Sequence, residues 1–245
     1  MKKPVRKNAV SSPGPSSLGL GAIQRETLND RVYRQLRTMI MSGGVSPGKE
    51  LKLRELAKEL HVSLMPVRDA IGRLVVERAL EMLPNRQVIV PELSLDRLLE
   101  VRRVRVVLEG EAGALAAQHA TPDLLDSLRA LQEKIAAPSL RKQHEFFALN
   151  REFHFAIYQA AQSPLLFSMI EQLWLQIGPV FNHISVDYVS EGAEAHEKII
   201  AALLARDAHA TRAAIAEDLT KGGERIAAAL TGAQQRKIAL PGQSG

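Results

Sequence analysis

The fold is decided by residues 50–73, which read ELKLRELAKELHVSLMPVRDAIGR. Apolar residues recur at helical spacing through the first half of this stretch and predict one short helix. These residues are Leu53, Leu56, Ala57 and Leu60. After an interruption at His61, Ser63 is a suitable N-cap for a second helix, and Pro66 falls in its first turn, where proline is tolerated. Two short helices joined by a tight turn predict a helix-turn-helix.

The second helix is expected to have an apolar back and a basic front. Its buried side carries Val67, Ala70, Ile71, Leu74 and Val75. Its opposite side carries Met65, Arg68, Asp69, Gly72 and Arg73. A short helix of this kind fits the major groove of DNA. The alternative at this point is a pair of ordinary surface helices with solvated arginines, because helix-turn-helix patterns are short and degenerate.

The flanking segments favour DNA binding. Residues 80–90 predict a β-hairpin whose turn, Pro84–Arg86, has a basic tip, as in the wing of a winged helix-turn-helix. Before the motif, a helix is predicted from Thr27, which can cap it, to Ser42, where a run of glycines follows. We therefore expect a mainly α protein whose winged helix-turn-helix domain spans residues 26–91 and includes a small β-hairpin wing.

Composition narrows the classes of protein further. Residues 1–91 contain 16 Lys and Arg against 8 Asp and Glu, whereas the remainder contains 16 against 19, so the N-terminal part is expected to meet a polyanion. The absence of cysteine excludes disulfides and thiolate chemistry. No apolar run approaches a membrane span and the N-terminus lacks the apolar core of a signal peptide, so we expect a cytoplasmic protein without a membrane partner. Residues 1–25 read as a disordered basic arm and residues 233–245 as a disordered tail.

Residues 92–232 predict an all-α helical bundle of roughly six helices. The first long helix carries Arg105 inside an apolar stripe. A buried arginine needs an anion, because an unpaired charge in a core is very costly. Glu109, one turn further on, could satisfy it. The other interpretation is that Arg105 waits for the carboxylate of a ligand.

Four more polar residues lie inside the apolar stripes of later helices: Asn150, His154, His196 and Asp218. Each alone is more often a hydrogen-bonded core group than a metal ligand. Several in one bundle favour a metal site, because bundle cores build such sites from facing helices. Asn150 and His154 are one turn apart, a spacing at which two side chains can reach one ion.

Residues 27–91 resemble the DNA-binding domain of the GntR family of bacterial transcriptional regulators. The resemblance rests on Ser-Gly-Gly-Val-Ser-Pro-Gly from 42, Leu-Arg-Glu-Leu-Ala from 53 and Val-Ser-x-x-Pro-Val-Arg-Asp-Ala from 62. It implies DNA contacts by Arg54 and Arg68, and phosphate contacts by Ser63 and Arg86. With Met65 and Arg73 from the front of the helix, the expected DNA-binding set is Arg54, Ser63, Met65, Arg68, Arg73 and Arg86.

Four positions depart from the family pattern. Leu64 and Met65 stand where the family commonly has Arg-Thr, so one expected DNA contact is lost. His61 stands where Gly is usual in the turn, and His is among the residues that tolerate positive φ. Gln87 replaces a common Gly of the wing. These departures bear on the operator sequence more than on the fold.

The later part of the chain resembles the FCD effector domain of the FadR branch of the GntR family. The resemblance rests on LLEVRRVRVVLEGEAGALAAQHA from 98, ALNREFHFAIYQAAQSPLL from 148 and AEAHEKIIAALLARDAHATRAAIAEDL from 193. It implies an all-α bundle that binds a small molecule, often a carboxylate, beside a divalent metal held by an Asp and three His. Position by position these ligands correspond to Asn150, His154, His196 and Asp218.

Two of those ligands are therefore intact and two are exchanged. Mixed nitrogen and oxygen ligands favour zinc, nickel or manganese. Arg105 matches an arginine that commonly faces the ligand, so the expected effector-binding set is Arg105, Asn150, His154 and His196.

We expect a ligand-responsive regulator of transcription, a repressor, that binds a pseudo-palindromic operator in double-stranded DNA as a homodimer and responds to a small organic acid. A different class would be a metal-dependent hydrolase bundle with a basic DNA-binding appendage. No cysteine nucleophile and no His-Glu-x-x-His run support it. A third class, a non-specific architectural DNA binder, leaves the polar residues inside the bundle unexplained.

Overall fold

The computed structural model describes residues 27–137, 142–183 and 189–239, so the expected N-terminal arm and residues 240–245 lie outside the described residues. The described chain is mainly helical, with one two-stranded antiparallel sheet, which confirms the predicted fold class. In chain order the elements are α1 (Leu28–Met41), α2 (Leu53–Glu59), α3 (Leu64–Val76), β1 (Glu81–Met82), β2 (Val88–Ile89), α4 (Leu95–His119), α5 (Pro122–Ala136), α6 (Gln143–Ala160), α7 (Pro164–Ile177), the 3₁₀ helix η1 (Gly178–His183), α8 (Val189–Leu204) and α9 (Ala208–Ala239).

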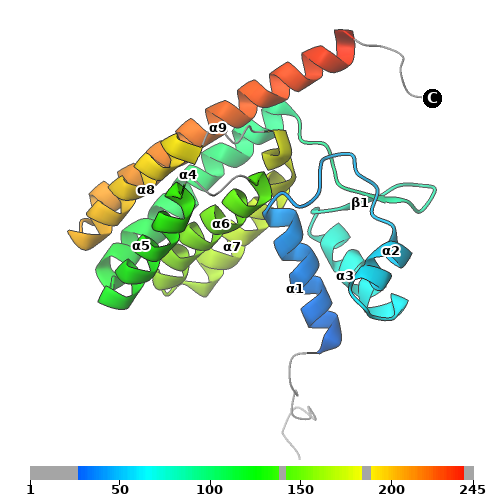
Figure 1. The fold of residues 1–245 in the computed structure, drawn as a ribbon, viewed down its shortest axis with the longest axis horizontal. Coiled ribbons are helices and arrows are strands. Elements are labelled where there is room, and N and C mark those ends of the chain that lie inside the picture. Colours follow the sequence, from blue (N-terminus) through cyan, green and yellow to red (C-terminus); the bar gives the residue numbers. More distant parts are fainter. Residues whose placement is uncertain (1–26, 138–141, 184–188, 240–245) are drawn as a thin grey trace, which may run out of the picture.

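The N-terminal lobe holds α1–α3 and the hairpin, at the right of Figure 1. Thr27 and Asp30 form a capping box that satisfies free N–H groups at the start of α1. His61, in the turn between α2 and α3, has a φ of 53°, as its place in the motif predicts. In the hairpin, Glu81 pairs with Ile89 and Met82 with Val88. The winged helix-turn-helix predicted from the sequence is therefore present.

The apolar backs of these elements form the core of the lobe. From α1 it receives Val32, Leu36 and Ile40, and from α3 Val67, Ala70, Ile71 and Leu74. Truncating one of the larger of these side chains to alanine typically costs about 2–5 kcal/mol. This burial fixes the rotation of α3, and so decides which of its residues face outward.

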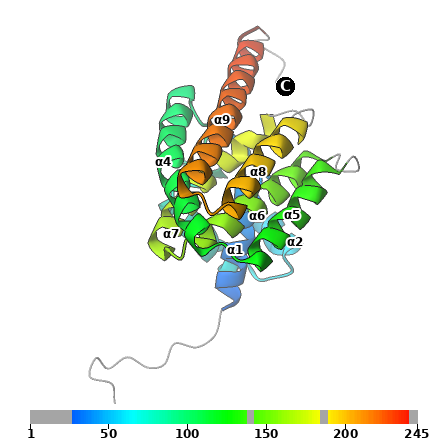
Figure 2. The same ribbon diagram turned by 90° about the vertical axis from the view of Figure 1, so that its left-hand side faces the viewer.

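The bundle consists of α4–α9, with the long helices α4 and α9 packed against each other, as Figures 1 and 2 both show. Gly113 of α4 makes this packing close, since a Cβ there would lie 2.2 Å from Cδ1 of Ile215 on α9. The helix α9 continues to Ala239, beyond residue 232, the predicted end of the bundle domain. None of the described helices is both long enough and apolar enough to cross a membrane.

The two lobes meet through α1, which packs on α3 on one side and on α7 and η1 on the other (Figure 1). Gly178 lies so close to α1 that a Cβ would be 2.3 Å from the Ile40 carbonyl oxygen. Asn182 Nδ2 lies within hydrogen-bonding distance of the carbonyl oxygens of Gly43 (2.6 Å), Val45 (2.9 Å) and Pro179 (3.1 Å). The loop after α1 is therefore fastened to η1, the segment that follows α7 in the bundle.

Candidate functional site

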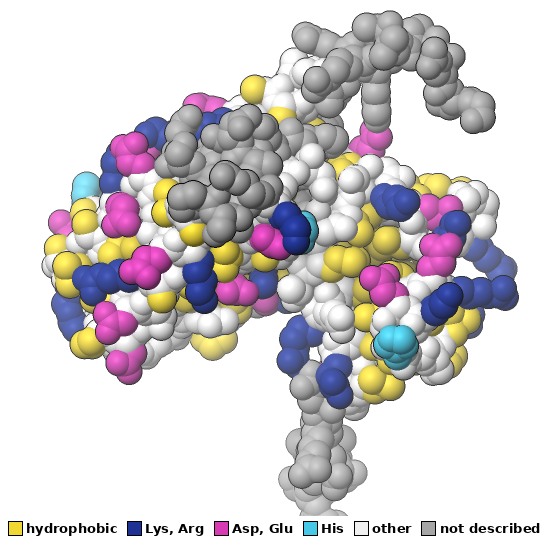
Figure 3. Space-filling model, viewed as in Figure 1, with side chains coloured by type: hydrophobic (Ala, Val, Ile, Leu, Met, Phe, Trp, Pro, Cys, Tyr) yellow, Lys and Arg dark blue, Asp and Glu magenta, His cyan; other side chains and the backbone are white. Residues whose placement is uncertain are grey.

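The front of α3 is an exposed surface with a basic character. Met65 is 67% exposed, and Arg68 is exposed with no ion pair or hydrogen bond among the described residues. Ser63 stands at the N-cap of α3, but its side chain makes no capping hydrogen bond, so the hydroxyl is left for another partner. Figure 3 shows Lys and Arg side chains along the outer edge of this lobe, at the right of the view.

Two further predicted contacts lie beside this helix. Arg54 is exposed at the start of α2 and forms no ion pair with Glu50 or Glu59. Arg86 is exposed at the tip of the wing, with a φ of 66°, and its backbone N–H donates to the Leu83 carbonyl oxygen at 2.8 Å. Both guanidinium groups are therefore available to phosphates or bases.

Arg73 differs from the other predicted DNA contacts. Its Nη1 lies 2.9 Å from Oδ1 of Asp30, and its guanidinium carbon lies 3.7 Å from the centre of the Tyr33 ring. The Tyr33 hydroxyl donates to Glu77, and burial together with this bond raises the pKa of Tyr33 to about 12. Arg73 thus links the recognition helix to α1. Its charge is already paired with Asp30.

Inside the bundle, a cavity of about 60 Å³ lies among α4, α6, α7, η1 and α9. Its walls include four of the residues singled out from the sequence, Arg105, Asn150, His154 and Asp218. The other residues lining it are Phe146, Phe147, Trp174, Phe181, Leu219, Gly222, Gly223 and Ile226. His196 does not line the cavity, but its ring centre lies 5.2 Å from that of His154.

Arg105 has the partner that the sequence offered as an alternative. Its Nε lies 2.5 Å from Oε1 of Glu109, and its Nη2 lies 3.2 Å from Oε2. Oε2 also accepts a hydrogen bond from the Tyr158 hydroxyl at 2.6 Å. Burial and the Glu109 carboxylate raise the pKa of Tyr158 well above its usual value, so this hydroxyl keeps its proton.

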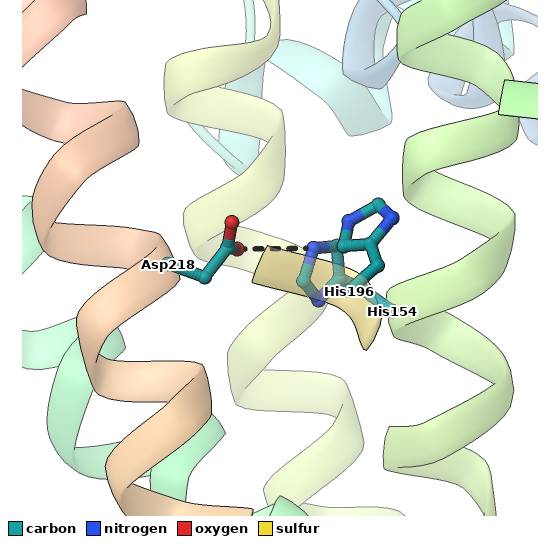
Figure 4. A group of neighbouring side chains, drawn as sticks. All are labelled: His154, His196 and Asp218. Atoms are coloured by element: carbon teal, nitrogen blue, oxygen red, sulfur yellow. Dashed lines mark ion pairs between the residues drawn. The ribbon is translucent and has the colours of Figure 1, made fainter. Parts of the chain in front are cut away.

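The single proton of Tyr158 determines which nitrogen of His154 carries hydrogen. Because that proton is donated to Glu109, the Tyr158 oxygen accepts from Nδ1 of His154, 3.2 Å away. Nε2 of His154 then faces Oδ2 of Asp218 at 3.3 Å (Figure 4). A lone pair and a carboxylate cannot face each other favourably, so a proton or a metal ion has to lie between them.

His196 is arranged in the same way. Gln132 donates from Nε2 to the Ala193 carbonyl oxygen at 2.7 Å, which leaves Oε1 to accept from Nδ1 of His196 at 3.0 Å. Burial and the charge of nearby His154 lower the pKa of His196 to about 3, so its ring is neutral. Its Nε2 is a buried acceptor with no hydrogen-bond partner among the described residues.

These groups fit a divalent metal ion. One ligand atom each from His154, His196 and Asp218 lie within 4.8 Å of one another. Although burial acts to raise the pKa of Asp218, the hydrogen bond and charge of His154 outweigh it and lower that pKa, which keeps a carboxylate available. Both imidazoles are oriented by hydrogen bonds through Nδ1, the usual support for a metal-binding histidine. Asn150 lines the same cavity one turn before His154.

Sequence reasoning missed Tyr158, Gln132 and Trp174. Tyr158 follows His154 by four residues, so the one-turn spacing used for Asn150 could have found it. Gln132 lies on another helix, and no local pattern connects it to His196. Trp174, the only tryptophan of the chain, lines the cavity, and the guanidinium of Arg105 lies 4.7 Å from its ring centre.

An exposed recognition helix with a wing, joined to a bundle with a buried polar cavity, defines a DNA-binding regulator with an effector domain. Residues 28–90 match the family described as bacterial regulatory proteins, gntR family, and residues 100–221 match the FCD domain. The chain belongs to the GntR family of transcriptional regulators and carries an FCD domain. It is therefore a regulator and not an enzyme, which removes the hydrolase alternative.

Two curated relatives extend over most of the chain. The HTH-type transcriptional regulator McbR of Escherichia coli strain K12 is 35% identical over 204 residues, which are 81% of this chain and 92% of McbR. The HTH-type transcriptional repressor RspR of the same strain is 27% identical over 205 residues, 82% of this chain and 90% of RspR. Among solved structures, E. coli McbR/YncC matches with a TM-score of 0.78 at 33% identity, covering 82% of this chain and 98% of that one.

Proposed function

We propose that this regulator represses transcription as a homodimer, and that a small carboxylate bound in the bundle beside a divalent metal ion changes its affinity for DNA. The observation that carries this proposal is the buried cluster of His154, His196 and Asp218 beside Arg105. The sign of regulation is supported by the relative RspR, which is named a repressor.

The homodimer would place two copies of α3 in successive major grooves, about 34 Å apart on one face of the DNA. Arg68 would read base edges, while Arg54, Ser63 and Arg86 would hold phosphates. On the bundle, Val104 and Val107 of α4 are exposed three residues apart, so both face the same side of the helix. This apolar patch supports association between two copies.

The metal would be held by Nε2 of His154, Nε2 of His196 and a carboxylate oxygen of Asp218. Three protein ligands leave further coordination positions open, as in metal sites that bind a substrate or water. When bound, the ion would supply a Lewis-acidic point for an oxygen of the effector. Zinc, nickel and manganese remain the proposed ions because the ligands are nitrogen and oxygen.

The charge balance of the cavity favours an anionic effector. Two positive charges on the metal and one on Arg105 meet one negative charge each on Glu109 and Asp218. One positive charge is left over, and a single carboxylate would neutralise it. Arg105 can take part without leaving Glu109, since Nη1 has no hydrogen bond to Glu109.

The signal would reach the DNA-binding lobe through η1. Phe181 of η1 lines the cavity and stacks on Phe147 at 4.4 Å between ring centres. The next residue, Asn182, binds carbonyl oxygens of the loop that follows α1. A displacement of Phe181 by an effector would therefore also move Asn182 and, through its hydrogen bonds, the loop that follows α1. Such coupling requires that the effector prefer one of the two arrangements.

Metal content tests the first part of the proposal. Protein purified without a histidine tag, loaded with zinc and dialysed, is expected to retain one ion per chain by elemental analysis. Asp218→Asn should weaken zinc binding by more than the roughly 10–100-fold that is typical for a residue that only supports a ligand. Glu217→Gln is the matched control, because Glu217 is exposed and, among the described residues, pairs only with Lys198 and Lys221. Equal zinc binding by both variants would remove Asp218 from the site.

DNA binding tests the second part. Fluorescence anisotropy with a duplex from the chain's own promoter should show tight binding that zinc-loaded protein loses when an acid from a panel of organic acids is added. The same acid should raise the melting temperature of the protein. A panel of acids that changes neither quantity would refute the carboxylate part of the proposal.

A further inference from the structure

Gly72 occupies a place in α3 where a glycine is unfavourable for the free protein. It lies in the interior of the helix, where glycine is less stable than alanine. Its φ is not positive, so the backbone conformation does not require a glycine. An added Cβ would have no neighbouring atom within 4 Å, whereas at Gly113 it would lie 2.2 Å from Cδ1 of Ile215. No contact among the described residues therefore accounts for the missing side chain.

The missing side chain lies on the outward side of α3. Gly72 is exposed, one turn after Arg68 and one turn before Val76, so these three residues follow one stripe of the helix. A shallow hollow on this surface is lined by Gly72 and by neighbours that include Met65 and Arg68. The side of α3 that lacks a side chain is thus the side expected to face DNA.

The dimensions of DNA give a reason for a short residue at this place. An α-helix with its side chains is about 10–12 Å across, and the major groove is about 12 Å wide and 8.5 Å deep. A helix therefore reaches the floor of the groove only where the side chains that face the walls are short. Gly72 lies about 10 Å along the helix axis from Met65. With the first turn of α3 at the base edges, Gly72 meets the sugar–phosphate wall.

Met65, in the first turn of α3, is the apolar side chain that this close approach brings to the bases. It is exposed three residues before Arg68, so both side chains face the same side of the helix. The apolar group that a base edge presents in the major groove is the 5-methyl group of thymine. The flexible thioether of methionine packs readily on such a group, and the contact removes both from water.

We infer that Met65 is a specificity-determining residue that packs on the 5-methyl group of a thymine in each operator half-site. Gly72 is the positioning residue that lets α3 lie deep enough for this contact, beside the base that Arg68 reads. The inference rests on the proposed placement of α3 in the major groove. It adds an apolar contact to the arginine contacts, and it assigns thymine to one position of each half-site.

Replacing thymine with uracil tests the Met65 contact, because uracil lacks only the methyl group. The probe is a duplex selected by the full-length protein from random DNA sequences, with each thymine replaced in turn. For the wild type, one such replacement in each half-site should weaken binding about fourfold, the effect of one buried methyl group. Met65→Ala should bind the thymine and uracil duplexes equally. Met169→Ala is the matched control, since Met169 is also exposed but lies on α7 of the bundle, and it should keep the fourfold difference.

Two substitutions test the role of Gly72. Gly72→Ala should raise the melting temperature, because alanine favours the helix and its Cβ meets no neighbour, yet it should weaken binding to the selected duplex. Gly72→Gln, with a longer side chain, should weaken that binding further, by about tenfold or more. A scrambled duplex, bound mainly through its phosphates, should bind both variants nearly as well as it binds the wild type.

The outcomes separate this inference from the proposed function. If no uracil replacement weakens binding by the wild type, or if Met65→Ala keeps the difference, Met65 does not read a thymine methyl group. If Gly72→Gln binds the selected duplex as tightly as the wild type, α3 does not lie close to DNA at this position. Either result leaves the proposed function standing as long as Arg68→Ala weakens binding. If Arg68→Ala binds normally as well, the proposed placement of α3 in the groove also fails.

Discussion

The two lobes use arginine in opposite ways. Arg68 on α3 is exposed and has no partner among the described residues, whereas Arg105 on α4 is buried and bound by both carboxylate oxygens of Glu109. An exposed guanidinium is solvated while it waits for DNA, but a buried one is unstable without a countercharge. The DNA-binding lobe can therefore present free charge, while the bundle has to neutralise its charge internally.

Arg37 lies where the two lobes meet, and its burial is intermediate between that of Arg68 and that of Arg105. Its Nη1 lies 2.8 Å from Oε1 of Glu171 on α7, and its Nε lies 3.7 Å from Oε2 of Glu77 at the end of α3. Its side chain is 15% exposed. The half-buried arginine thus joins one carboxylate from each lobe, which neither Arg68 nor Arg105 does.

The largest effect is expected from the buried charge. Glu109→Gln leaves Arg105 without its countercharge and should lower the free energy of unfolding in urea by about 3–5 kcal/mol. Glu111→Gln, on the same helix, breaks the exposed pair with Arg212 and should cost about 1 kcal/mol or less. Similar losses in the two variants would contradict the contrast between buried and exposed arginines.

Removing an exposed arginine of the DNA-binding lobe should lower the affinity for DNA and leave the stability of the protein unchanged. Arg68→Ala is expected to weaken operator binding by about 1–3 kcal/mol in fluorescence anisotropy, with an unchanged melting temperature. Arg73→Ala should do the reverse, because Arg73 is bound to Asp30 and stacked on Tyr33: a modest loss of stability and a smaller loss of affinity. Lys134→Ala, an exposed charge on α5, serves as the control with no effect on either. An Arg68→Ala protein with wild-type affinity would remove this residue from the DNA interface.

The hydrogen bonds that support the proposed metal ligands give a third comparison. Gln132→Met keeps the length of the side chain but removes the acceptor for Nδ1 of His196. We expect zinc affinity, measured by competition with a chelator, to fall about 10–100-fold while DNA binding in the absence of effector stays the same. Unchanged zinc affinity would mean that His196 is not a ligand or does not need Gln132 to orient it.

The smallest effect concerns the junction. Asn182→Ala removes the hydrogen bonds between η1 and the loop after α1, at about 1 kcal/mol each. Operator affinity should change little, but the response to an effector should shrink, because Phe181 would no longer be linked to the loop. Anisotropy titrations with and without the acid would measure this response as the ratio of the two operator affinities. If Asn182→Ala has the same ratio as the wild type, the effector acts on the DNA-binding lobe through another contact, such as that of Arg37 with Glu171.

Much of the architecture was predictable because it rests on local patterns. Periodicity and turn residues predicted the helix-turn-helix and the wing, and the four-residue spacing offered Glu109 as a partner for Arg105. The end of α9 was harder. Residues 233–245 were predicted to be a disordered tail, yet α9 runs to Ala239, and residues 233–239 contain no Pro or Gly to interrupt it.

The site was only partly predictable. His154, His196 and Asp218 were found by asking which polar residues interrupt apolar stripes. Their orientation depends on Tyr158 and Gln132, and the partner of Arg73 is Asp30, 43 residues earlier. Such contacts depend on how each helix is rotated against its neighbours, which one sequence does not reveal. The sequence also could not show that Arg105 pairs with Glu109, since Glu109 and the carboxylate of a ligand were both possible partners.

Asn182 carries two amide hydrogens, yet three carbonyl oxygens lie within 3.1 Å of its nitrogen. One carbonyl is therefore always left over. If the loop after α1 slides along η1, the hydrogen can pass from Gly43 or Val45 to Pro179 without a net loss of hydrogen bonds. Such a shift would cost little hydrogen-bond energy. An effector that favoured the shifted arrangement would then need only a small difference in binding free energy to select it.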